Sequence, residues 1–156
     1  MQRLCELTNI APAHEKNGAQ AIGRSRGGLT TKIAALGDAL GNPFELILAP
    51  GQDHDLTCAD SLLENADPGA LIGDKAFDAD PLLITLKRRG ITPVIPPKAN
   101  RKVKRDCDYA LYRERNLIER FFNKIKHFRA IATRYDKLAR NFLAAVQLVS
   151  VIILLN

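Results

Sequence analysis

Cysteine is scarce in this chain of 156 residues, tryptophan is absent, and aromatic residues make up only 6% of the sequence. The three cysteines, Cys5, Cys58 and Cys107, lie far apart, and none belongs to a C-x-x-C pair. An odd number of scattered cysteines argues against a disulfide framework and against a thiolate zinc site. We therefore expect reduced thiols and a cytoplasmic location.

Long hydrophobic runs are absent as well. The first 30 residues contain no apolar run of signal-peptide length. The most hydrophobic stretch, residues 142–155, is shorter than the roughly 20 residues that a membrane-spanning helix needs. We expect neither secretion nor a membrane partner, and we interpret residues 142–155 as a buried C-terminal helix that covers the core.

Acidic residues are scarce in the second half of the chain. Residues 1–78 carry 6 basic and 11 acidic side chains, a net charge of −5, whereas residues 79–156 carry 17 and 6, a net charge of +11. All 17 of these cations lie within residues 87–140, beside only 5 acids. Such a surplus favours contact with nucleic-acid phosphates. Because no aromatic residues alternate with the cations, double-stranded DNA is a better candidate partner than a single strand.

The apolar pattern predicts a mixed α/β sheet with helices on its faces. Strict alternation predicts a strand over residues 29–35, and a strand over residues 44–48 is its hairpin partner. Further along the chain we expect strands at residues 70–73 and 91–95 and helices that begin near residues 55, 80, 111 and 138. Residues 1–28 are polar and weakly periodic. The expected organisation is therefore a loop-rich N-terminal segment, residues 1–28, and one domain, residues 29–156.

The predicted helix of residues 111–128 has an ordered polar stripe beside its apolar face. At about 100° per residue, the four members of the stripe fall within about 60° of one another. They are Tyr112, Arg115, Glu119 and Lys126. The stripe places one carboxylate between two cations, where an anionic substrate could bind. The alternative is a solvated face on which Glu119 forms only weak ion pairs.

A second candidate carboxylate, Asp74, directly follows the short apolar run of residues 70–73. Functional groups gather at the carboxyl ends of strands in open α/β sheets, so Asp74 and Glu119 are candidates to share divalent metal, Mg²⁺ or Mn²⁺. Metal held in this way catalyses phosphodiester transfer, and Lys126 would then bind a DNA phosphate. Asp74 alone is equally compatible with an ordinary turn residue.

The other charged residues near these segments have simpler interpretations. Asp78 and Asp80 are predicted to be turn and cap residues. The acids and histidine of residues 53–55 precede a predicted helix, where caps are commoner than metal ligands. Arg24 and Arg26 belong to a glycine-bearing loop and are candidates for DNA contact.

The spacing of the polar stripe resembles a known signature. Tyr112, Arg115, Glu119 and Lys126, with gaps of two, three and six residues, are similar to the segment around the last catalytic acid of bacterial insertion-sequence transposases of the DDE class. The run Ile72-Gly73-Asp74-Lys75-Ala76-Phe77-Asp78 resembles the segment around the second catalytic Asp of that family. Further similar segments are residues 22–32, 95–97 and 132–137, so that the resemblance covers roughly residues 17–155.

The resemblance implies a ribonuclease-H-like fold in which three carboxylates bind two Mg²⁺ ions. It implies cutting of one strand at each transposon end, followed by attack of the freed 3′ hydroxyl on target DNA. Asp74 and Glu119 match the second and third carboxylates. Tyr112, Arg115 and Lys126 would position DNA phosphates, and an active protein would be a homo-oligomer.

The first carboxylate of the family has no clear match. Counting back from residues 17–18 puts it at or before Met1, so the chain is expected to be truncated at its N-terminus, with the first strand missing or replaced. Glu6 is the nearest acid and the candidate first carboxylate, and residues 3–10 are the candidate replacement for the strand. The chain also has Ala34 where family members usually carry His.

Three functions therefore stay open. The first is a DNA transposase, and the second is a catalytically inert DNA-binding remnant that inhibits a full-length transposase. A hydrolytic nuclease on the same fold is a third. Metal-dependent activity separates the first from the second, and joining of cleaved ends to new DNA separates the first from the third.

Overall fold

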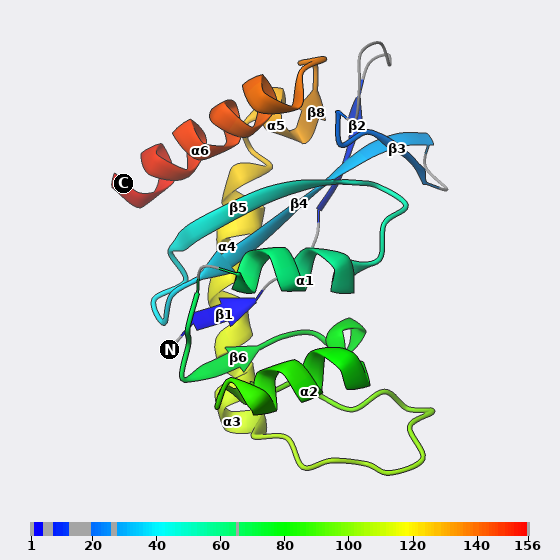
Figure 1. Ribbon diagram of the computed structural model, residues 1–156. Helices are drawn as coiled ribbons and strands as arrows, with labels where there is room; N and C mark the ends of the chain where they lie inside the picture. The colour runs from blue at the N-terminus through cyan, green and yellow to red at the C-terminus, as the bar shows by residue number, and fades with distance from the viewer. Residues whose placement is uncertain (1, 5–7, 13–19, 26–27, 65, 156) are drawn as a thin grey trace.

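The computed structural model describes residues 2–4, 8–12, 20–25, 28–64 and 66–155 (Figure 1). Within them, one sheet contains β1 Gln2–Leu4, β2 Thr8–Pro12, β3 Gly23–Ser25, β4 Gly28–Gly37, β5 Pro43–Pro50, β6 Ala70–Ile72, β7 Thr92–Val94 and β8 Thr133–Arg134. The helices are α1 Asp55–Leu63, α2 Asp80–Arg88, α3 Tyr109–Tyr112, α4 Asn116–Ile125, α5 Arg129–Ala132 and α6 Ala139–Leu155. Two 3₁₀ turns are η1 Lys75–Phe77 and η2 Arg113–Arg115. The predicted mixed α/β content is confirmed.

The long strand β4 lies at the centre of the sheet. One of its edges pairs antiparallel with β5, which confirms the predicted hairpin, and the other edge pairs with β1 and β2. Its side chains alternate between the two faces. Ala34 and Leu36 are buried on the face that α1 covers, and Ile33 and Ala35 are buried on the opposite face. Ala34 is thus part of the core.

The strand β1 joins two differently built parts of the sheet. It pairs antiparallel with β4, where Leu4 lies opposite Leu36, and parallel with β6, where Arg3 lies opposite Ile72. β6 in turn pairs parallel with β7. The expected pairing of residues 3–10 at this position is confirmed for the described residues of that segment.

The first 28 residues are less loop-like than their composition suggested, because β1, β2 and β3 lie among them. These strands have three to five residues each. A strand of that length has too few residues to show a clear alternation, and β4 holds all three by backbone pairing.

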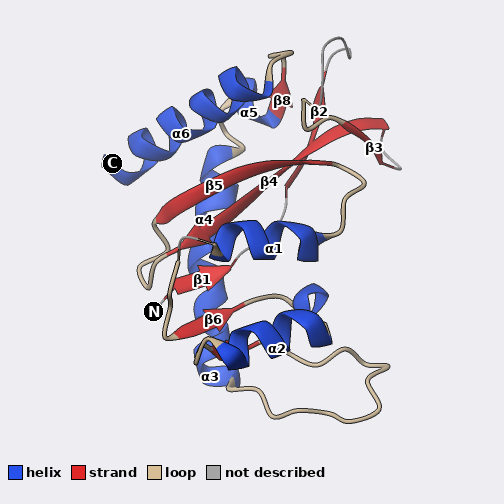
Figure 2. Cartoon of the chain, in the orientation of Figure 1, coloured by secondary structure: helices blue, strands red, loops and turns tan. Residues whose placement is uncertain are grey.

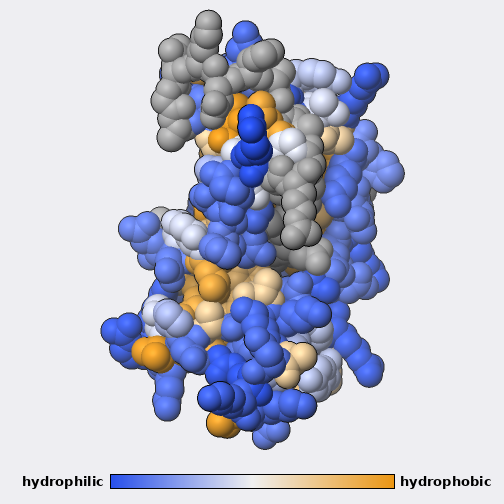
Figure 3. All heavy atoms as spheres, turned by 90° about the vertical axis from the view of Figure 1, so that its right-hand side faces the viewer, coloured by the Kyte–Doolittle hydropathy of each residue, from blue (hydrophilic) through white to orange (hydrophobic). Residues whose placement is uncertain are grey.

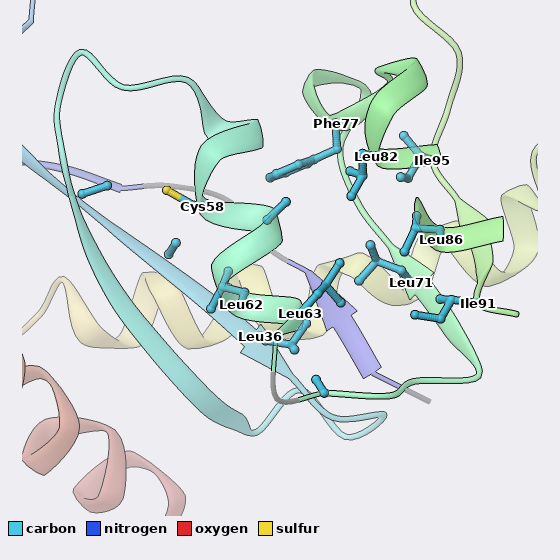
Figure 4. Close-up of a cluster of buried hydrophobic side chains, with 14 residues drawn as sticks. Leu36, Cys58, Leu62, Leu63, Leu71, Phe77, Leu82, Leu86, Ile91 and Ile95 are labelled. Carbon is cyan, nitrogen blue, oxygen red and sulfur yellow. The ribbon is translucent and has the colours of Figure 1, made fainter. Parts of the chain in front are cut away.

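Helices cover both faces of the sheet (Figures 1 and 2). On one face, leucines of α1 and α2 meet Leu36 of β4 and Leu71 of β6 (Figure 4). On the other face, α4, α5 and α6 pack against β4 and β5. Burying a leucine side chain completely stabilises the fold by about 1.5–3 kcal/mol. The two layers therefore hold the strands and the helices in fixed positions relative to one another.

The C-terminal helix α6 is only half buried, so the prediction of a buried helix is wrong for one side. Phe142 and Val146 are buried against the core. Leu148 and Leu155, however, are 63% and 81% exposed. The apolar residues are not confined to one side of this helix, and only one side contacts the sheet. No helix in the described part of the chain has the length and hydropathy to cross a membrane.

Arg134 is the largest completely buried side chain of the described residues. Its guanidinium donates to backbone carbonyls and to one hydroxyl, and it lies 5.0 Å from the centre of the Phe142 ring. The acceptors are the carbonyls of Gln20 at 2.9 Å, Asp136 at 2.9 Å and Lys137 at 3.2 Å and the Thr31 hydroxyl at 2.7 Å. One side chain thus connects β8, β4, α6 and the residues before β3.

We predict that Arg134→Lys lowers the free energy of unfolding by about 2–4 kcal/mol. An ammonium group lacks the planar fork, so several buried carbonyls lose their donor. Urea denaturation measures the change, and Arg140→Lys, at an exposed position of α6, is the control with an expected change below about 0.5 kcal/mol. Equal stability of the two variants would contradict the assignment.

Candidate active site

Asp74 lies where the buried strand β6 leaves the sheet. The Gly73 amide still donates to the Val94 carbonyl of β7 at 3.2 Å, and Asp74 then begins the turn η1. Its Oδ1 accepts a hydrogen bond from the Lys75 amide at 2.6 Å. Its Oδ2 accepts none from any described residue, and the side chain is half exposed. One oxygen of this carboxylate is therefore available to a ligand.

The predicted helix of residues 111–128 is a helical rod over residues 109–125. The Asp108 carboxylate accepts a hydrogen bond from the Leu111 amide and so caps the start of α3, and η2 and α4 follow without a break. The predicted core face is confirmed, because Ile118, Phe121, Phe122 and Ile125 are buried. η2 has the tighter winding of a 3₁₀ helix, which changes the angles between Tyr112 and the residues after it.

Three of the four stripe residues meet on this rod. Arg115 Nη2 lies 2.7 Å from Oε1 of Glu119, which is four residues further along the chain. The centre of the same guanidinium lies 5.5 Å from the centre of the Tyr112 ring. Tyr112 itself packs against the buried residues of β6 and β7. Both partners of the ion pair are shielded, with side chains only 18% and 30% exposed.

Both candidate carboxylates affect the pKa of the Tyr112 hydroxyl. Burial raises its pKa above the ordinary value, and the negative charges of Asp74 and Glu119 both raise it further. The charge of Arg115 and its hydrogen bond to Tyr112 oppose these effects without cancelling them. Asp74 and Glu119 are 45 residues apart in the sequence, yet both act on the same phenol.

The chemistry of these groups fits a hard divalent cation in part. Asp74 Oδ2 and Glu119 Oε2 have no hydrogen-bond or ion-pair partner among the described residues, and Mg²⁺ is commonly held by one or two carboxylates together with substrate phosphates. The described residues contain no group of three metal-ligating side chains. The donor set thus fits a metal whose remaining ligands come from substrate or from residues outside the described ranges.

The remaining predicted site residues lie elsewhere. Lys126 is exposed at the end of α4, seven residues beyond Glu119 and so about 10 Å further along the helix axis. Arg24 is exposed on β3, near the top of Figure 1 and far from β6. Arg26 and Glu6 lie outside the described residues. The structure therefore brings together Asp74, Tyr112, Arg115 and Glu119.

A lysine of β4 binds the residues at the start of α1. Lys32 donates to Asp55 Oδ1 at 2.9 Å and to the Asp53 carbonyl at 2.6 Å. The N-cap of α1 is His54, one residue before the position expected for the cap, and Asp55 is the first helical residue. Asp53, His54 and Asp55 are not part of any group of metal-ligating side chains in the described part of the chain.

The sequence analysis missed the role of Asp78, which it interpreted as a turn residue. The Asp78 side chain is completely buried and forms ion pairs with Arg101 and Arg105, which follow β7. Asp78 does end the turn η1, so the turn itself was predicted. No spacing rule connects residue 78 with residues 101 and 105, and the only sequence signal was an acid four residues after Asp74.

Comparison with known proteins gives one consistent family. Two family descriptions, both "Transposase DDE domain", match the chain over residues 71–156 and residues 8–110. A Brucella ovis protein named "Putative transposase for insertion sequence element IS6501" is 37% identical over 130 residues, which are 82% of this chain and 100% of the relative. Asp74 and Glu119 both lie within the first matched range.

We predict that Tyr112 loses its proton above the ordinary tyrosine pKa of about 10. In Asp74→Asn and in Glu119→Gln its pKa should fall, because each change removes a negative charge that disfavours the phenolate. Carbon-13 NMR of labelled tyrosine across the titration measures this. Asp67→Asn, at an 85% exposed position, is the control. An unchanged Tyr112 pKa in both site variants would show that the carboxylates do not meet there.

Proposed function

The chain belongs to the DDE transposase family of insertion sequences, and on that premise we propose that it cuts and joins DNA by metal-dependent phosphodiester transfer at Asp74 and Glu119. Membership of the family implies a ribonuclease-H-like fold, and the mixed sheet with helices on both faces is compatible with it. The observation that carries the proposal is geometric: Tyr112 packs against β6, the strand that leads to Asp74, and Arg115 contacts both the Tyr112 ring and Glu119.

Each site residue has a role that follows from its position. Asp74 Oδ2 and Glu119 Oε2 would hold Mg²⁺ or Mn²⁺, which when bound activates the attacking oxygen and stabilises the leaving one. Arg115 pairs with Glu119 and fixes its rotamer. Tyr112, beside both acids, would donate a hydrogen bond from its hydroxyl to a phosphate oxygen and so position it.

Lys126 lies further along the chain than the four residues of the site, at the end of α4. Its distance of about 10 Å from Glu119 along the helix axis is larger than the rise of about 3.4 Å per phosphate that one DNA strand makes along the duplex axis. Lys126 would therefore contact the backbone beyond the reacting phosphate, and Arg24 and Arg26 would contact it at a greater distance. Because two transposon ends must be joined in one reaction, the active species is a homo-oligomer.

A second candidate function is a catalytically inert DNA-binding protein that competes with a complete transposase. One observation favours it: the described residues bring only two carboxylates to the site, and Arg115 already neutralises one of them. The candidate for the first carboxylate of the family, which would complete the site, is Glu6. The two functions share DNA as partner and differ in metal binding.

We predict that the chain binds Mn²⁺ and that Asp74→Asn, Glu119→Gln and Glu6→Gln each weaken the binding at least about 10-fold. Even a change in the outer shell of a metal site costs about 10–100-fold in affinity, and these changes remove ligands. Calorimetric titration of Mn²⁺ measures the effect. Asp60→Asn, at an exposed position of α1, should bind as the unchanged chain does.

Assays of a labelled insertion-sequence end then separate the functions. Joining of the cleaved end to a second DNA, lost in Asp74→Asn and Glu119→Gln, supports the transposase. Cleavage without joining would identify a nuclease. Salt-sensitive DNA binding without Mn²⁺ binding would identify the inert DNA-binding protein.

A further inference from the structure

The short turn η1 carries one carboxylate at each end. Asp74 is its N-cap and Asp78 its C-cap, and the turn is closed by hydrogen bonds from the Phe77 amide to the Asp74 carbonyl at 2.9 Å and from the Asp78 amide to the Lys75 carbonyl at 3.1 Å. Asp74 is half exposed, whereas the Asp78 side chain is completely buried. The two carboxylates therefore lie at opposite ends of one three-residue turn.

Asp78 binds a basic loop that follows β7, namely residues 98–105. Its Oδ2 accepts hydrogen bonds from the Lys98 amide at 2.7 Å and from Arg101 Nε at 2.9 Å, and its Oδ1 accepts one from Arg105. Burial raises the pKa of Asp78, but these hydrogen bonds and the two guanidinium charges outweigh it and leave the pKa below its usual range. The buried group is thus an anion with three donors from one loop.

The tip of this loop projects away from the protein. Arg101 and Arg105 flank residues 102–104, and both bind the same carboxylate, so the loop is closed at its base. Lys102 and Lys104 are exposed and have no ion-pair partner among the described residues, and Val103 between them is 74% exposed. Because Asp78 and Asp80 already offset the two arginines, the free charge at the tip of the loop belongs to Lys102 and Lys104.

The loop lies on the side of the molecule to which β6 points. In Figure 1, β6, η1 and the loop after β7 all extend toward the right-hand side. Figure 3 views the protein from that side and shows mainly hydrophilic residues in the lower part of the face, with a few hydrophobic ones among them. DNA that contacts the loop would therefore pass the end of β6, where Asp74 lies.

From this geometry we propose that Asp78 is a positioning residue that fixes the loop of residues 98–105 as a DNA-backbone contact beside Asp74. Lys102 and Lys104 bind phosphates, and the buried ion pairs keep them at a constant distance from the turn η1. The proposal rests on the proposed function, because it names the surface that presents DNA to that site.

The first test measures how DNA binding depends on salt. Each phosphate contact contributes about 0.9 to the slope of log affinity against log salt concentration, so Lys102→Gln/Lys104→Gln should reduce the slope by about 1.8. The matched control is Lys137→Gln/Arg140→Gln, which removes the same charge at exposed positions around the start of α6. The control should keep the slope within about 0.5 of the unchanged chain.

The second test uses Asp78→Asn, for which the change in net charge and the loss of the positioning role predict opposite changes in DNA affinity. The change removes a negative charge, so net charge alone predicts tighter DNA binding and a steeper slope. If Asp78 positions the loop, binding weakens and the slope falls by about 1.8, as in the double-lysine variant. Trypsin should also cut Asp78→Asn faster after Lys102 and Lys104, and duplex DNA should protect these sites in the unchanged chain.

The outcomes are distinct. Circular dichroism shows whether Asp78→Asn folds. If it does not fold, the inference is tested by the salt slope of the double-lysine variant and by the protection of the unchanged chain from trypsin by duplex DNA. An unchanged slope in the double-lysine variant, or tighter DNA binding by folded Asp78→Asn, overturns this inference. Mn²⁺ binding at Asp74 and Glu119 would in that case still support the proposed function. Failure of the unchanged chain to bind DNA overturns the proposed function itself.

Discussion

The structure depends on the pairing of one short strand. In the described part of the sheet, the antiparallel strands around β4 and the parallel pair of β6 and β7 are joined through β1, by two residue pairs on each side. β6 ends at Asp74, and β4 supplies part of the surface against which α4, with Glu119, is packed. The relative position of the two candidate carboxylates therefore follows from the register of β1. The pairing itself is made by backbone hydrogen bonds, which do not require particular side chains.

This dependence explains which parts of the fold the sequence could predict. The hairpin of β4 and β5, the starts of α2 and α6 and the buried face of α4 have strong local signals, namely alternation, proline near a helix start and helical periodicity. The strands β1 and β3 have three residues each, too few for a pattern. The exposed side of α6 was predicted to be buried because hydrophobicity alone does not show how many faces of a helix find a partner.

The candidate site also divides into residues that local sequence patterns could group and residues that they could not. Tyr112, Arg115 and Glu119 could be grouped from the sequence because one helical rod carries them, and helical spacing is a local property. Asp74 could be added only through the rule on strand ends and the family resemblance. The ion pairs of Asp78 with Arg101 and Arg105 span more than 20 residues of sequence, and their buried geometry depends on how the loop after β7 folds back onto η1. No local pattern contains that information, so a residue next to the site was assigned to a turn.

The basic segment of residues 87–140 is not a uniform positive surface, and this changes what its charge can do. Five of its ten arginines have specific partners within the fold: Arg89, Arg101, Arg105, Arg115 and Arg134. None of its lysines forms an ion pair with a described residue. The guanidinium fork matches carboxylates and carbonyls in fixed directions, whereas an ammonium group is a mobile, strongly hydrated charge. Those arginines accordingly hold loops and carboxylates in place, and the lysines remain available to phosphates. The net charge of the segment therefore overstates the number of phosphates it can neutralise. Five of its seven lysines lie at the end of α4 or on the loop of residues 98–105, and these positions indicate the path of the DNA backbone more closely than the total charge does.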